Sequence, residues 1–170
     1  MPLPSTMTPI ATNTLTAAAA SVTFSNLPQG YTDLILVVNA GETTPNNNGV
    51  RLRFNNSTAS NYSSTYLSGN GSAASSNRET GLVSMGTAWF VAPNSSPGNY
   101  VLIANVINYS NTTTNKSVLM RTTKAENAVE ASVGLYPSTS AITVLTVELS
   151  GSGNTFVSGS TFTIYGVKAA

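Results

Sequence analysis

Apolar and polar residues alternate in short blocks along most of this chain. Residues 50–54 read VRLRF and residues 161–164 read TFTI, so an apolar side chain recurs at every second position in both blocks. A period of two is typical of a half-buried β-strand, because successive side chains point to opposite faces of a sheet. Both blocks are therefore predicted to be strands with one face in a core.

Two other blocks are apolar at every position. Residues 34–38 read LILVV and residues 101–104 read VLIA. A strand of this kind needs cover on both faces, so each is expected to lie centrally in a sheet or to have its outer face covered by a partner. Residues 142–149 shift their apolar phase by one position, which a β-bulge would accommodate.

Shorter apolar blocks complete the pattern, and stretches rich in Gly, Ser, Asn and Pro separate them. Further strands are predicted at residues 22–24, 62–67, 82–85, 89–91, 118–122 and 133–136, with turns at residues 41–49, 68–77, 93–99, 110–115 and 150–159. Strand and turn alternate about every 8 to 15 residues, which predicts an all-β fold, a jelly-roll-like antiparallel β-sandwich.

One segment has the spacing of a helix. Glu126 and Glu130 lie one helical turn apart within residues 123–131, so this segment could hold a short helix with both carboxylates on a solvated face. The expected organisation is an N-terminal arm and first strand in residues 1–20, followed by the sandwich domain in residues 21–170.

The N-terminal segment, residues 1–9, is marked by three prolines. Proline lacks a backbone donor and disfavours helix in the residue before it, so the segment is expected to be extended and poorly tied to the sandwich. Such an arm suits docking on a neighbouring protein, and the candidate attachment residues are Pro2, Leu3, Pro4, Met7, Pro9 and Ile10. The alternative is a frayed terminus with no role.

Charge is scarce in this sequence. Only 8% of the 170 residues are charged, and seven Lys or Arg against six Asp or Glu leave a formal net charge of +1. So weak a field attracts phosphate or anionic lipid poorly, and nucleic acid is not an expected partner. No apolar run approaches the roughly 20 residues that cross a bilayer, so membrane insertion is not expected either.

The inventory of catalytic groups is short. The chain has no His and no Cys, which excludes Ser-His-Asp and Cys-His systems and removes the usual zinc ligands. An enzyme would need two of the six carboxylates to converge in a cleft, and sequence spacing leaves that arrangement open. We therefore expect a protein that is not an enzyme and that binds no metal and no cofactor.

Several blocks, taken in order, carry a resemblance. They are residues 11–15 (ATNTL), 21–28 (SVTFSNLP), 31–34 (YTDL), 51–55 (RLRFN), 61–63 (NYS), 138–143 (STSAIT) and 159–168 (GSTFTIYGVK). Together they resemble a family of small virion structural proteins of tailed bacteriophages, and they span most of the chain. The resemblance implies a jelly-roll domain exposed on the virion, usually trimeric, that serves as capsid decoration, cement or a fibre tip. It carries over no catalytic residue.

The expected function is that of a non-enzymatic virion structural protein on the particle surface, assembled in the host bacterial cytoplasm. A homotrimeric capsid decoration or cement protein, attached to another virion protein, is the first expectation. The alternative is a tail-fibre or fibre-tip protein that binds a host surface glycan. In that case Tyr62, Tyr66 and Trp89 are candidates for stacking on sugar rings, whereas the competing interpretation places these aromatic residues in the core or a subunit interface.

Overall fold

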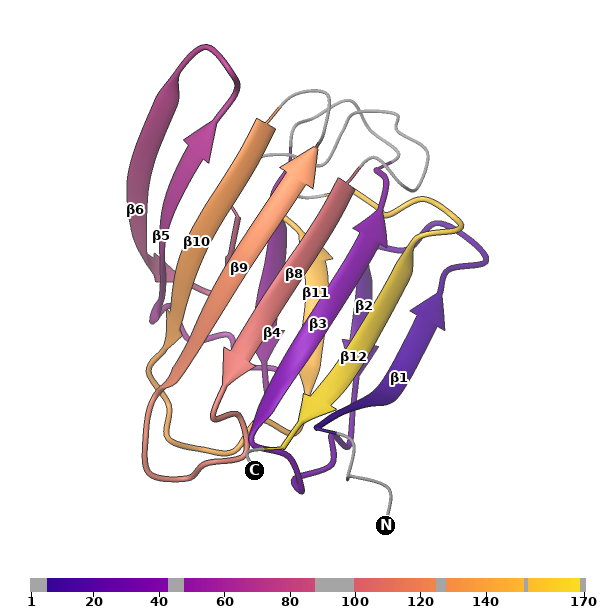
Figure 1. The fold of residues 1–170 in the computed structure, drawn as a ribbon, viewed down its shortest axis with the longest axis vertical. Helices are drawn as coiled ribbons and strands as arrows, with labels where there is room; N and C mark the ends of the chain where they lie inside the picture. The colour runs from indigo at the N-terminus through magenta and orange to yellow at the C-terminus, as the bar shows by residue number, and fades with distance from the viewer. Residues whose placement is uncertain (1–5, 43–47, 88–99, 125–127, 152, 169–170) are drawn as a thin grey trace.

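The computed structural model describes residues 6–42, 48–87, 100–124, 128–151 and 153–168. These residues form a β-sandwich of twelve strands in two antiparallel sheets (Figure 1). The described residues include no helix, and so none that is long and apolar enough to span a membrane. The all-β sandwich expected from the alternating pattern is confirmed.

The larger sheet has eight strands and the smaller sheet has four. In spatial order the larger sheet contains β1 (Met7–Thr14), β12 (Thr161–Val167), β3 (Asp33–Ala40), β8 (Tyr100–Ile107), β9 (Lys116–Lys124), β10 (Ala128–Tyr136), β5 (Tyr62–Gly69) and β6 (Ala74–Leu82). The smaller sheet contains β2 (Ser21–Phe24), β11 (Leu145–Leu149), β4 (Val50–Phe54) and β7 (Met85–Gly86). Figure 1 looks onto the face of the larger sheet that is turned away from the smaller one, and we call this the outer face.

The strand pairing is nested along the chain. Strand β3 pairs with β12, β4 with β11, β5 with β10, and β8 with its immediate neighbour β9, all of them antiparallel. A long hairpin wrapped around a core produces this arrangement, as in a jelly roll. Strands β1 and β2 then extend the two sheets by pairing with β12 and β11.

The core lies between the smaller sheet and the inner face of the larger one. Along β3 burial alternates strictly, so that Leu34, Leu36 and Val38 are fully buried while the residues between them are half-buried on the outer face. The rings of Tyr62 and Tyr136 stack in this core with their centroids 4.7 Å apart. Removing one apolar face of each strand from water is the main stabilising force, and it selects the inward-facing set.

Two local expectations are wrong. The helix expected at residues 123–131 is absent from its described part, where β9 ends at Lys124 and β10 begins at Ala128. Glu130 is accordingly buried on the inner face of β10 rather than solvated, and Glu126 lies outside the described residues. The bulge expected within residues 142–149 is also absent, because β11 begins only at Leu145 and pairs without a register shift.

The N-terminal segment is tied to the sheet more firmly than expected. Strand β1 pairs with β12 from Met7 opposite Val167 to Thr14 opposite Thr161, with an irregularity beside Pro9. The expectation of a poorly tied segment is therefore wrong for residues 7–9, and residues 1–5 lie outside the described residues. Proline is compatible with a strand at the edge of a sheet, where its missing N–H costs no ladder hydrogen bond.

Candidate functional site

Exposed apolar side chains gather on the outer face of three adjacent strands, β9, β10 and β5. Five such side chains, between 38% and 63% exposed, form what we call the apolar patch: Leu67, Leu119, Val129, Val133 and Leu135. Among the described residues only Met7 and Val83 are large apolar side chains of similar exposure, and neither belongs to these strands. The patch is thus a local concentration of exposed apolar surface.

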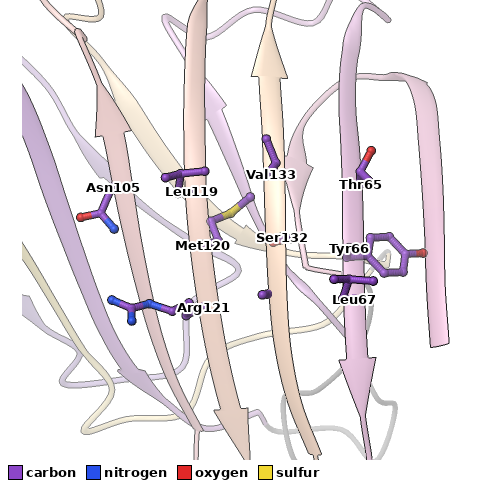
Figure 2. A pocket seen from close by; sticks show the side chains of 10 residues that line it. Thr65, Tyr66, Leu67, Asn105, Leu119, Met120, Arg121, Ser132 and Val133 are labelled. Atoms are coloured by element: carbon purple, nitrogen blue, oxygen red, sulfur yellow. The ribbon is translucent and has the colours of Figure 1, made fainter. Parts of the chain in front are cut away.

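Strand register brings the members of the patch together. Val133 of β10 lies opposite Leu119 of β9, and one row along Ala131 lies between Arg121 of β9 and Leu67 of β5. Residues directly opposite in antiparallel strands have Cβ atoms about 5 Å apart, so the side chains within each row are neighbours. Figure 2 shows the longer of these side chains spread over the three strands.

Strand β10 supplies the centre of the patch through an inverted pattern. Its outer positions are Val129, Ala131, Val133 and Leu135, whereas its inner positions include Glu130, Ser132 and Gly134. Most strands of a sandwich place their apolar set toward the core and their polar set toward water. In β10 the more apolar set points away from the smaller sheet.

The patch is hollowed at its centre. Two neighbouring hollows of about 460 Å³ and 470 Å³ share Leu67, Arg121 and Ala131 in their lining. Alanine is the small residue of this row, so its methyl group leaves space between the longer side chains on either side. The result is an apolar depression on the surface of the sheet, lined on one side by Arg121.

Two ion pairs lie near the smaller sheet instead of the patch. Arg51 Nη2 is 3.2 Å from Glu79 Oε2, and Arg53 pairs with Glu148. Both arginines belong to β4, so the first pair connects the smaller sheet to β6 of the larger one, and the second lies within the smaller sheet between β4 and β11. Partly exposed pairs of this kind contribute about 0 to 1 kcal/mol each.

Several titratable groups are buried in the sandwich. Lys116 is fully buried, its Nζ donates to two backbone carbonyl oxygens at 2.7 and 3.1 Å, and burial lowers its pKa. Burial raises the pKa of Tyr62 to about 12 and also raises the pKa of Tyr100 and Tyr109. These groups affect stability at high pH, and none of them lines the apolar patch.

The carboxylates do not assemble a metal site in the part of the chain that the structure describes, where no cluster of three His, Cys, Asp or Glu side chains occurs.

Comparison with known proteins gives no family. No protein-family model matches the chain, and no characterised protein matches it in sequence. The apolar patch is therefore the feature on which a functional proposal rests.

The attachment residues that were predicted from sequence and that the structure describes lie far from the patch. Met7, Pro9 and Ile10 belong to β1, at the opposite edge of the larger sheet from β5 and β6. Met7 and Pro9 are exposed, whereas Ile10 is half-buried and packs against the core. The other three candidates, Pro2, Leu3 and Pro4, lie outside the described residues.

The aromatic residues considered for glycan contact present no ring at the described surface. Tyr62 is fully buried, and its hydroxyl accepts the N–H of Phe54 at 3.1 Å. Tyr66 is 5% exposed, and its hydroxyl accepts Nδ2–H of Asn77 at 2.9 Å. Both placements agree with the competing interpretation as core residues, and Trp89 lies outside the described residues.

Proposed function

We propose that this chain is a non-enzymatic structural protein of a bacteriophage virion, exposed on the particle surface as a capsid decoration or cement protein. It acts by docking, and the apolar patch on the outer face is its docking surface. The phage assignment comes from the resemblance of the sequence blocks, and the docking mode comes from the surface of the sandwich.

The inverted pattern of β10 carries the proposal. The outer side chains of Val129, Val133 and Leu135 remain between 38% and 60% exposed in the isolated chain. Burying such side chains stabilises by about 25 cal/mol for each Å² of apolar surface, so a strand that keeps them in water gains only when a partner covers them. A shift of register by one residue would have turned them inward, and the observed pairing does not take that course.

The size of the patch agrees with a macromolecular partner. Residues 129–135 span about 20 Å along β10, and the three strands span about 10 Å from centre to centre, so the patch and its margins cover on the order of 300 Å² in projection. Exposed patches of this size or larger on soluble proteins are often interaction sites. The area of the patch is consistent with the central apolar part of an interface that buries about 800 Å² on each partner.

A fibre tip that binds a host glycan is the second candidate. It would need aromatic rings at the surface, and the two described candidates are in the core. No described feature favours it over decoration, so the proposal keeps the capsid role.

Quantitative mass spectrometry of purified phage particles tests the proposal. We expect the chain to be present at several hundred copies per particle, because a decoration protein follows the symmetry of the capsid. A handful of copies per particle would instead indicate that the protein is located in the tail. Its absence from particles would contradict the virion role altogether.

Two valine variants test whether docking uses the patch. Val133 and Val83 are 49% and 46% exposed, and only Val133 lies in the patch. The Val133→Lys variant is expected to bind particles that lack the protein at least about tenfold more weakly, because a desolvated lysine in an apolar interface costs more than about 1.4 kcal/mol. Val83→Lys is the matched control and should bind as the unmodified protein does. Equal binding of both variants would remove the patch from the proposal.

Light scattering tests the homotrimer that the resemblance to virion proteins implies. A closed trimer would give about three times the chain mass of 17.5 kDa. A monomer at micromolar concentration would limit assembly to the particle itself.

A further inference from the structure

The neighbourhood of the apolar patch is positively charged. Arg121 lines both hollows, and Arg78 of β6 lies opposite Thr65 of β5, which places it on the same outer face. Both arginines are exposed, and neither forms an ion pair with a described residue. Alternation places the carboxylates of the same strands, Glu130 and Glu79, on the opposite face.

The distance between the two arginines favours a protein as the ligand over a small molecule. Arg121 lies on β9 and Arg78 on β6, three strands away and about two residues along, so their Cα atoms are about 16 Å apart. The apolar patch lies between them. The hollows lie open on the sheet, whereas a small-molecule site encloses about 70 to 90% of its ligand.

Among the described residues, the patch of a second copy carries no complementary charge. The two partly exposed glutamates already pair with arginines of β4, and Asp33 accepts the backbone N–H of Asn108 at 2.7 Å. The remaining described carboxylates, Glu42 and Glu130, are buried. Packing the patch of one copy on the patch of another would therefore bring arginines together with no carboxylate within either patch, and like charges in an interface disfavour association.

We infer that the outer face of β9, β10, β5 and β6 docks a different protein, one that presents an apolar side chain flanked by carboxylates. The apolar side chain enters the hollow over Ala131, and the carboxylates pair with Arg121 and Arg78. Charge-assisted hydrogen bonds from a guanidinium to a carboxylate fix the orientation of the partner, while the apolar contact supplies most of the affinity. The identification of that partner as a neighbouring virion protein rests on the proposed function.

Amide chemical shifts of the isotope-labelled full chain test the inference with defined probes. The first probe is a tetrapeptide that alternates aspartate with leucine and phenylalanine, and the second has lysine in place of aspartate. We expect the acidic peptide to bind weakly, with a Kd on the order of 1 mM for so small a fragment, and to shift amides of residues 65–67, 119–121 and 129–133. The lysine peptide should shift none of them.

Charge-inverting variants give the matched controls. Arg121→Glu should weaken the acidic peptide at least about fivefold and allow the lysine peptide to bind, and Arg78→Glu should act in the same direction. Lys168→Glu makes the same change in net charge at an exposed position after β12, and it should leave both peptides unaffected. Ala131→Leu fills the hollow without changing charge and should weaken the acidic peptide while the chain keeps its spectrum.

Four outcomes would overturn the inference: no shift with the acidic peptide, equal shifts with both peptides, shifts centred outside the patch, or an Arg121→Glu variant that behaves as Lys168→Glu does. A trimer that Val133→Lys converts to monomers would also overturn it, because a second copy would then occupy the face. Particle binding separates the two proposals. If Arg121→Glu decorates particles normally, the docking chemistry is wrong and the virion role stands; if the peptide results hold but particles never contain the chain, the virion role is wrong and the acidic docking site stands.

Discussion

Raising the pH from about 8 to about 11 is expected to lower the free energy of unfolding by about 1.4 kcal/mol through Tyr62 alone. Burial in the core raises the pKa of this hydroxyl from 10.0 to about 12. Above pH 10 the unfolded chain releases the proton while the folded chain retains it, so stability falls as pH rises and the loss approaches about 2.7 kcal/mol above pH 12. Denaturant unfolding at a series of pH values measures this slope.

Other buried groups modify the alkaline slope in known directions. The raised pKa values of Tyr100 and Tyr109 add to the loss above pH 10. The lowered pKa of Lys116 acts in the opposite sense, since the unfolded chain then binds the proton more tightly and stability rises with pH below 10.5. Three tyrosines oppose one lysine, so the net expectation is destabilisation. A Tyr62→Phe variant should show a shallower slope, and equal stability at pH 8 and pH 11 in the unmodified protein would contradict the prediction.

The Asn55→Ala variant is expected to lose about 4 kcal/mol of stability. Asn55 Oδ1 accepts the backbone N–H groups of Thr143 and Val144 at 2.8 and 3.2 Å, and its Nδ2 donates to the carbonyl oxygen of Ala141 at 2.9 Å. Each bond contributes about 1 kcal/mol net. The residue also has a φ of 50°, a left-handed conformation that costs alanine about 1 kcal/mol more than asparagine.

The next residue provides a matched control for this prediction. Asn56 has a φ of 54°, and its side chain makes no hydrogen bond with another described residue. Asn56→Ala should therefore lose only the conformational part, about 1 kcal/mol. Urea unfolding of both variants measures the difference. Equal losses would show that backbone conformation, and not the side-chain bonds to residues 141–144, accounts for the effect.

Strands with one face in the core were predictable because burial of that face requires an apolar residue at every second position. Strand β4 occupies the predicted residues 50–54, and the blocks at residues 34–38 and 101–104 lie within the central strands β3 and β8. Their outer faces are half-buried by neighbouring side chains, in keeping with their central position. In these places local pattern and final environment agree.

The bounds of the two edge strands of the larger sheet could not be predicted from the local pattern. Strand β6 is exposed at most positions on both faces, so burial imposes no apolar period on its Ser, Asn and Thr residues, and residues 74–77 were assigned to a turn. A first strand is predicted within residues 1–20, but Pro9 favours a loose arm over residues 1–9, so β1 begins earlier, at Met7, than the pattern indicates. Strand β6 is held by backbone pairing with β5, from which a turn separates it in the sequence. Strand β1 is held by pairing with β12, which is distant in the sequence.

The apolar residues of the candidate site could be recognised in the sequence, but the face of the sheet to which they point could not. The apolar set at residues 129, 131, 133 and 135 can be read from the sequence. The natural assumption turns such a set toward the core, and the spacing of Glu126 and Glu130 suggested a helix instead. Only the pairing of β10 with both β9 and β5 decides which face points outward. The site could therefore not be predicted, because the register between strands depends on pairing that no local sequence pattern contains.

The position of β12 governs how a newly synthesised chain can fold. This strand leaves the ribosome after the other eleven described strands, yet it is inserted between β1 and β3, the first and third of them. The hairpins β8–β9 and β9–β10 can close early, but one edge of β3 stays unpaired until residues 161–167 arrive. Contacts of such long sequence separation form in milliseconds to seconds, and an open apolar strand edge invites aggregation during that interval. Completion of the larger sheet is thus expected to come late in folding, with β12 as the strand that completes it.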